Sequence, residues 1–181
     1  QAGVLIKNAE ALERFEKIDT LIVDNAGGAL AAVPASASIT GFETIRLEAT
    51  DDSAVDAFTL DANIAAFDAI IIDASDENDT YTITDVTDET ISIVESANNA
   101  VALVDVSLKD ATGTADSATL TITNADAATA LTMTDINSTG GGIETLNLVL
   151  NQGKDISGGS DIIIADVSST HSSGVVVTGA A

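Results

Sequence analysis

The chain has 181 residues with 29 acidic and 6 basic side chains, so its formal net charge is -23 at pH 7. Because nucleic acids and anionic membranes carry charge of the same sign, this balance argues against both as partners and favours cations. Hydrophobic residues make up 45% of the chain, aromatic residues only 3%, and cysteine is absent, which excludes a disulfide scaffold and thiolate chemistry. No apolar run of about 18 residues predicts membrane insertion, and no signal peptide is recognised.

Residues 1–24 differ in composition from the rest and predict a short helix followed by a strand. Asn8 is suited to cap the helix, and a strand from Thr20 to Val23 follows it. We expect the helix to cover one end of the fold. Its apolar positions recur at helical spacing: Ala9, Leu12, Phe15 and Ile18.

The sequence of residues 2–24, AGVLIKNAEALERFEKIDTLIVD, resembles the segment that leads into the phosphorylation site of heavy-metal P-type ATPases. In that family the strand ends in an Asp-Lys-Thr-Gly-Thr motif, and Asp24 falls on the phosphorylated aspartate. Here Asn25-Ala26-Gly27-Gly28 follow, so the lysine and both threonines are missing. Nothing downstream predicts membrane helices or a nucleotide-binding domain, so we do not expect pump activity. Two interpretations stay open: a cap joined to the first rung of the fold, or a segment of separate origin.

Residues 25–38 are rich in Ala, Gly and Ser, contain Pro34, the one proline, and predict a loop or linker. Beyond it, residues 39–181 repeat a five-residue pattern of an acid, a small residue or Thr, and two apolar positions separated by any residue, and a first copy of the pattern lies upstream at Asp19 to Val23. Successive copies are 24, 25, 21, 29 and 26 residues apart, an average of 25. The first apolar positions of these copies are Leu21, Ile45, Ile70, Ile91, Leu120 and Leu146.

A repeat of this length, with two or three short alternating strands in each copy, is typical of a solenoid. We therefore predict an all-β fold, a parallel β-helix or β-solenoid of about six coils, with a β-sandwich as the alternative. Stacking the copies predicts two inward aliphatic columns with mostly polar residues between them. One column contains Ile45, Ile70, Ile91, Leu120 and Leu146, and the other contains Leu47, Ile72, Ile93, Ile122 and Leu148.

Acidic residues follow many of the predicted strands, and stacked carboxylates repel one another unless a cation neutralises them. Ca²⁺ binds six to eight oxygen ligands in flexible geometry, so calcium is the cofactor that we expect. The densest cluster provides Asp73, Asp76, Glu77 and Asp79, and Asp161 follows Gly158-Gly159-Ser160 as a second candidate. The competing interpretation is that Asp and Asn serve as turn residues on a soluble surface.

The recurring acids at the start of the pattern could be viewed as paired catalytic carboxylates, but catalysis needs one differentiated group of residues rather than many equivalent ones. We expect these acids, Glu43, Asp68, Glu89 and Glu144, to form the corners of the coils. His171, the single histidine, lies in a loop-like run with no predicted catalytic partner. The sequence therefore predicts that the chain is not an enzyme.

Two sequences in residues 39–181, Gly41-Phe42-Glu43-Thr44-Ile45-Arg46-Leu47 and Gly142-Ile143-Glu144-Thr145-Leu146-Asn147-Leu148, resemble the repeat regions of bacterial S-layer proteins and RTX-type adhesins. The resemblance implies a secreted, calcium-dependent, self-assembling structural protein at the cell surface. The complete Gly-Gly-x-Gly-x-Asp nonapeptide of RTX repeats is absent. The expected partners are further copies of the chain, with a cell-surface polysaccharide as another candidate. An adhesin or carbohydrate-binding module is the alternative function.

Overall fold

The computed structural model of the chain describes residues 19–25, 39–49, 57–73, 79–95, 100–110, 112–113, 115–124, 130–138, 143–152, 162–169 and 174–179. Within these ranges about three quarters of the residues lie in strands, which form two sheets. The seven-stranded sheet contains β1 (Thr20–Asn25), β2 (Thr44–Ala49), β4 (Ala69–Asp73), β6 (Thr90–Glu95), β8 (Ser117–Asn124), β10 (Thr145–Gln152) and β12 (Gly174–Gly179), in that order.

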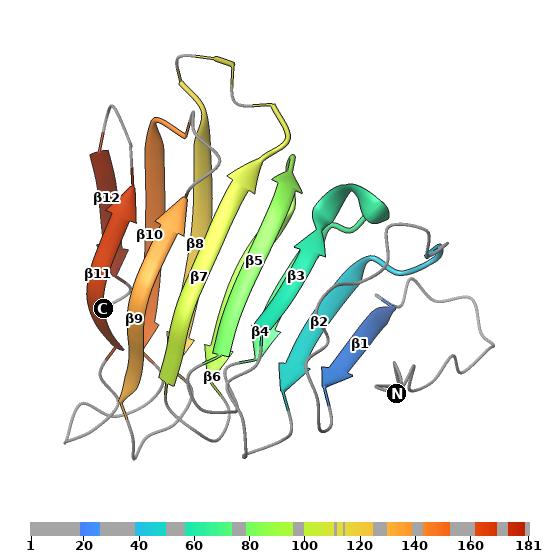
Figure 1. Cartoon of the computed structure of the whole chain (residues 1–181), viewed down its shortest axis with the longest axis horizontal. Helices are drawn as coiled ribbons and strands as arrows, with labels where there is room; N and C mark the ends of the chain where they lie inside the picture. Colours follow the sequence, from blue (N-terminus) through green and yellow to red (C-terminus); the bar gives the residue numbers. More distant parts are fainter. Residues whose placement is uncertain are drawn as a thin grey trace.

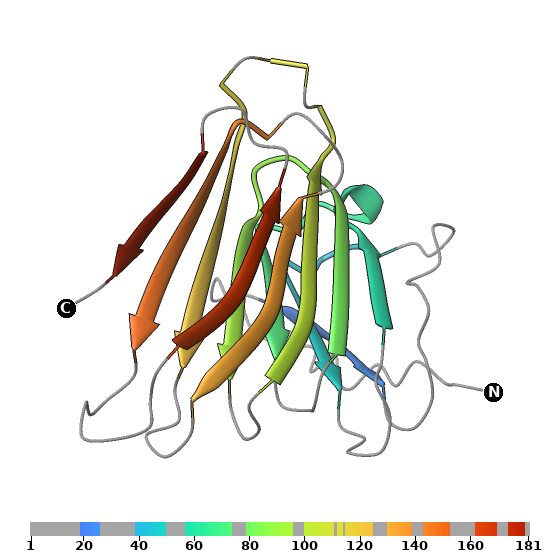
Figure 2. The ribbon, with the colours of Figure 1, turned by 60° about the vertical axis from the view of Figure 1, so that its left-hand side comes forward.

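The five-stranded sheet contains β3 (Ala57–Asp61), β5 (Asp79–Val86), β7 (Ala100–Leu108), β9 (Leu131–Ser138) and β11 (Ile162–Ser169). Between β2 and β12 the chain alternates between the sheets, and Figures 1 and 2 show them as two layers that face each other. Every pairing within each sheet is parallel. This arrangement is a parallel β-solenoid, and it excludes the alternative β-sandwich, whose strands pair antiparallel.

Each coil contributes one strand to each sheet, which is the lower limit of the two or three strands expected. The five-stranded sheet spans about four turns, fewer than the six coils predicted. The number of turns is smaller because the two sheets differ in length. β1 and β12 are the outer strands of the larger sheet, and the smaller sheet has no described strand before β3 or after β11. The predicted capping helix lies outside the described residues, so the division of the chain at residues 24 and 38 stays a prediction.

The core consists of aliphatic layers between the two sheets, as the alternating pattern predicted. Ile45, Ile70 and Ile91 lie in register on successive strands, and their neighbours two residues further on are buried beside them. Each such side chain contributes about 1.5 to 3 kcal/mol through burial. On the five-stranded sheet, Phe58 and Tyr81 are in register and their rings stack with centroids 5.2 Å apart.

The predicted partner of Leu146 is wrong by two residues. Leu146 pairs with Ala118, and Leu148 pairs with Leu120. Both leucines still point inward and are buried, because a shift of two residues keeps every side chain on the same face. The repeat that matches Glu144-Thr145-Leu146 is thus Asp116-Ser117-Ala118, in which the first apolar position is a small alanine.

The five-stranded sheet carries an irregularity that the repeat did not predict. In β5 the register with β7 shifts twice, and Asp85 adopts a left-handed backbone conformation with φ of 57°. Asp tolerates this conformation better than most residues, and the resulting bulge returns Val86 to the core. In β9, the inward residues Met133 and Ile136 are likewise three apart, so strict alternation fails there as well.

Candidate functional site

The acids that begin the repeated pattern lie at the corners where the chain enters the seven-stranded sheet. Main-chain hydrogen bonds join successive corners: Glu43 N donates to Asp19 O at 3.1 Å, and Asp68 N donates to Glu43 O at 2.7 Å. Further along, Glu144 N donates to Asp116 O at 2.9 Å. These bonds hold the corners together coil by coil, which agrees with the structural role expected for the column of acids.

Two glutamate side chains reinforce the same corners. Glu43 Oε2 accepts a hydrogen bond from Asp19 N, and Glu144 Oε2 accepts one from Asp116 N, each at 2.8 Å. Each carboxylate thus binds the backbone N–H of the acid one coil earlier, a charge-assisted contact that repeats along the solenoid. Glu89 differs, because its carboxylate accepts from the backbone N–H of Thr87 in its own turn at 2.7 Å.

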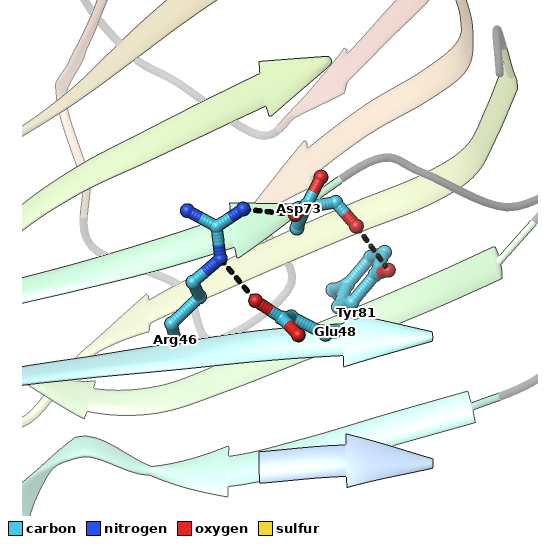
Figure 3. A network of polar contacts seen from close by, with 4 residues as sticks. All are labelled: Arg46, Glu48, Asp73 and Tyr81. Carbon is cyan, nitrogen blue, oxygen red and sulfur yellow. Dashed lines mark hydrogen bonds and ion pairs between the residues drawn. The ribbon is translucent and has the colours of Figure 1, made fainter. Parts of the chain in front are cut away.

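A second polar cluster lies at the carboxyl ends of the first strands, where the register brings Asp24, Glu48 and Asp73 onto successive rungs. Figure 3 shows Arg46 between two of these carboxylates. Arg46 Nη2 forms an ion pair and hydrogen bond with Asp73 Oδ2. Arg46 Nε lies 2.5 Å from Glu48 Oε1, but its N–H is buried and not aligned to donate a hydrogen bond.

Electrostatics favour the charged form of this arginine. Burial lowers the pKa of Arg46, but the attraction and hydrogen bonding of Asp73, together with the attraction of Glu48, outweigh it and leave the pKa raised. The Asp73 side chain is only 6% exposed, against 30% for Arg46 and 21% for Glu48. Arg46 therefore neutralises charge on a sheet face where stacked carboxylates would otherwise repel one another.

Two of the five predicted calcium ligands lie in the described residues. Asp73 ends β4 beside Arg46, and Asp79 begins β5 with its side chain buried. Tyr81 Oη lies within hydrogen-bond distance of both, at 3.3 Å from Asp73 O and 3.4 Å from Asp79 Oδ2 (Figure 3 shows the contact with Asp73). The structure thus brings the main-chain carbonyl of Asp73 and the carboxylate of Asp79 to one tyrosine hydroxyl. Sequence reasoning missed Arg46 and Tyr81 as members of this cluster.

The remaining predicted ligands, Asp76, Glu77 and Asp161, lie outside the described residues. Within the described ranges, no group of three or more His, Cys, Asp or Glu side chains is placed to hold a metal ion. The donors present fit Ca²⁺ in type, because they are hard oxygens, but Asp73 already has Arg46 as its counterion. A calcium site in this loop therefore stays a prediction that depends on residues 74–78.

A polar cavity of about 520 Å³ lies at the corner between the five-stranded and seven-stranded sheets. Lys109 Nζ donates to Asn63 Oδ1 at 2.5 Å at its rim, and three carboxylates line it. A neighbouring cavity of about 260 Å³ lies where β6 and β8 begin to pair. The carboxylates of the larger cavity are those of Asp68, Asp88 and Glu89.

The third notable surface is the last rung, formed by β11 and β12. Of the large hydrophobic residues that the structure describes, Ile163, Val176 and Val177 are the exposed ones, at 47%, 48% and 58%. Figure 2 shows β12, in dark red, as the outermost strand of its sheet.

Comparison with known proteins confirms the short resemblance expected near the start of the chain. A 27-residue segment is 82% identical to the silver exporting P-type ATPase of Salmonella typhimurium and 74% identical to the copper-exporting P-type ATPase of Legionella pneumophila. The match covers 15% of this chain and only 3% and 4% of those proteins. No family model and no solved structure matches the chain. The resemblance to S-layer and RTX repeats stays a prediction.

The described part of the segment that resembles the P-type ATPases, residues 19–25, belongs to the solenoid. β1 contains the predicted strand from Thr20 to Val23, and it pairs in register with β2 along its whole length. Leu21 and Val23 are buried in the core. Asp24, which the sequence resemblance would match to the phosphorylated aspartate of that family, lies in this paired strand and is largely buried. Among the described residues, no helix is long and apolar enough to cross a membrane.

Proposed function

We propose that the chain is a structural, self-assembling protein of the extracellular cell surface, a subunit of an S-layer or fibre that calcium stabilises. The single observation that carries this proposal is the continuous parallel β-solenoid, in which each coil repeats the same strands and the same acidic corners.

The distribution of charge supports the same proposal. A net charge of -23 keeps copies apart wherever acidic faces meet. Divalent cations relieve this repulsion, and the stacked carboxylates of Asp24, Glu48 and Asp73 show how closely the fold packs acids along one face. Assembly of such a surface is expected to depend on calcium, as the resemblance to S-layer and RTX repeats implies.

Electron microscopy of the purified chain tests the proposal. We expect sheets or filaments with millimolar CaCl₂ and isolated rods after EGTA. MgCl₂ at equal concentration is the control that separates specific binding of calcium from general screening. Isolated rods under every condition would contradict the proposed function, whereas assembly that EGTA leaves unchanged would contradict the role of calcium alone.

Substitutions in the predicted loop test where calcium binds. In the predicted loop, the pair Asp76→Asn and Glu77→Gln is expected to abolish calcium-dependent assembly and to weaken calcium binding measured by calorimetry. The matched control is Asp88→Asn, which removes a carboxylate from an exposed corner whose side chain contacts Thr87. Equal loss in both variants would show that overall charge, rather than a loop site, governs assembly.

The corner cavity favours a second candidate function, an adhesin or carbohydrate-binding module. Its lining combines an amine, an amide, one hydroxyl group and carboxylates, which are the groups that hydrogen-bond sugar hydroxyls. Binding to a glycan array by a monomer that never assembles would favour this function. Lys109→Ala should then abolish binding.

A further inference from the structure

The two outer faces of the solenoid differ in charge. The outer face of the five-stranded sheet carries aspartates on three neighbouring strands, Asp105 on β7, Asp135 on β9 and Asp166 on β11. In β6, β8 and β10 of the seven-stranded sheet, the residues that alternate with the buried ones include no Asp, Glu, Lys or Arg. We call this surface the neutral face. Its central residues are Ser92 on β6, Thr119 and Thr121 on β8, and Asn147 and Val149 on β10.

The neutral face is regular. Thr121 is in register with Ser92 on one side and with Val149 on the other, and neither pairing contains a register shift. The pairing of β5 with β7 on the other sheet, by contrast, shifts twice. Asn147 Nδ2 donates to Thr119 Oγ1 at 3.5 Å, so a polar contact links two strands across the face. Figure 2 shows the five-stranded sheet on one side of β8 and β10 and no described element on the other.

The side chains of the neutral face are suited to close contact with a like surface. Thr and Val are β-branched and stiff at χ1, so they lose little conformational freedom when a partner covers them. A threonine hydroxyl both donates and accepts a hydrogen bond, so it can pair with a second threonine. Long charged side chains, which a partner would have to desolvate, are absent from the outward positions of these three strands.

We infer that the neutral face packs against the neutral face of a second copy of this chain, around a twofold axis near Thr121. The inference rests on the proposed self-assembly and names the surface of one contact within it. A second copy is the partner because the chain has a net charge of -23, and opposed neutral faces bring no carboxylate against another. Such a contact uses the same surface on both copies, and stacked sheets lie about 10 Å apart. An axis parallel to the strands also directs the carboxylates of β1, β2 and β4 in the two copies away from each other.

This contact differs in chemistry from assembly through acidic surfaces. It contains no carboxylate, so it needs no calcium, and EGTA should leave it intact. It should strengthen with salt, because screening weakens the repulsion between the acidic bodies of the two copies. Three short strands bury less surface than a standard protein interface, so we expect micromolar or weaker affinity, and rods on a dilute microscope grid should be separate. Sedimentation between about 10 and 1000 µM, in about 0.05 and 0.5 M NaCl with EGTA, measures the dimer without calcium-driven assembly.

A single introduced thiol reports the position of the contact, because the chain has no cysteine. In EGTA we expect a short bis-maleimide cross-linker to convert most of Thr121→Cys to a covalent dimer. The matched control is Thr82→Cys on β5, which is also half-buried and is in register with Asp105 on the other outer face. This control should remain monomeric. Cross-linking of both variants to the same extent, or of neither, would overturn the inference.

Two charge variants separate the position of a charge from its amount. Thr121→Glu and Thr82→Glu change the net charge equally, but only the first places opposed carboxylates in the contact. We expect Thr121→Glu to weaken dimerisation at least about tenfold in sedimentation, and Thr82→Glu to leave it within about twofold. Thr121→Val keeps the shape of the side chain without adding charge and should preserve the dimer. Equal weakening by the two glutamates, or loss of the dimer in Thr121→Val with native circular dichroism, would contradict the inference.

The same measurements distinguish this contact from the proposed function. A wild-type chain that forms sheets or filaments with calcium, but shows neither a dimer nor cross-linking of Thr121→Cys in EGTA, contradicts the neutral-face contact alone. A chain that dimerises through the neutral face but never assembles further with calcium supports the contact and contradicts the proposed function.

Discussion

Replacement of Arg46 by methionine tests whether the polar cluster at the ends of β1, β2 and β4 stabilises the solenoid. Methionine keeps much of the apolar volume but removes the charge that faces Asp73. Breaking a fully buried ion pair costs about 3 to 5 kcal/mol, and an exposed one about 0 to 1 kcal/mol. Since Asp73 is 6% exposed and Arg46 30%, we expect a loss of about 2 kcal/mol in the free energy of unfolding.

The loss of stability should depend on which member of the ion-pair cluster is replaced. Asp73→Asn alone is expected to cost about 1.5 kcal/mol, because the arginine keeps Glu48 as a second counterion. The double variant should cost about 2 kcal/mol rather than the sum of the two, which gives a coupling energy of about 1.5 kcal/mol. Glu48→Gln is the matched control and should cost less than about 1 kcal/mol, because this carboxylate is more exposed than that of Asp73.

Urea unfolding followed by far-ultraviolet circular dichroism, in 0.15 M NaCl, measures these differences. The slope with urea should stay the same in all four variants, which would show that only stability has changed. Additive effects of the two single variants would refute the proposed coupling between Arg46 and Asp73. Equal losses for Arg46→Met and Glu48→Gln would show that burial of Asp73 does not set the cost.

Three further predictions concern the strand register, the hydrogen bonds at the coil corners and the response of Asp110 to low pH. Leu146→Ala should lower the free energy of unfolding by about 2 to 5 kcal/mol, and Ala118→Leu by about 1 to 3 kcal/mol. The loss in the double variant should be smaller than the sum by at least about 1 kcal/mol, because the two side chains are in register. Additive losses would contradict this register. Glu144→Ala should lower stability by about 1 kcal/mol in the same urea assay through loss of its inter-coil hydrogen bond, and a neutral result would refute a role for the carboxylate. Hydrogen bonds from the Thr112 hydroxyl and amide lower the pKa of Asp110. These contacts therefore stabilise the folded state above the ordinary pKa of 3.8, and they are lost as pH falls through the lowered pKa. The Thr112 amide resonance should titrate with a midpoint below pH 3.8, and a midpoint above that value would contradict the contact.

The repeated pattern was sufficient to predict the solenoid, because the alternation of buried and outward residues is encoded separately in each strand. The inward positions of Leu146 and Leu148 followed directly, since a shift by two residues leaves the facing unchanged. The partner strand could not be inferred as reliably. In β8 the first apolar position of the pattern is Ala118, and its small side chain made Leu120 the more obvious match for Leu146.

Contacts between coils were harder to predict than the coils themselves. Arg46 was identified only as an outward residue, because its pairing with Asp73 depends on strand register and on a separation of 27 residues. Tyr81 appeared to be an ordinary strand residue, and its proximity to Asp79 and to the backbone of Asp73 becomes visible only when both sheets are in place. A pattern within one repeat does not contain these distances.

The corners of this solenoid also determine how the chain can change over evolutionary time. The segment from Lys109 to Asp116 joins β7 to β8, yet main-chain bonds at both of its ends keep the coils in place: Lys109 N donates to Val86 O, and Asp116 O accepts from Glu144 N. Residues inserted between these anchors would extend outward without displacing a strand. The corners can therefore gain new binding loops while selection on the stacked strands continues independently, and surface recognition can diverge faster than the scaffold that supports it.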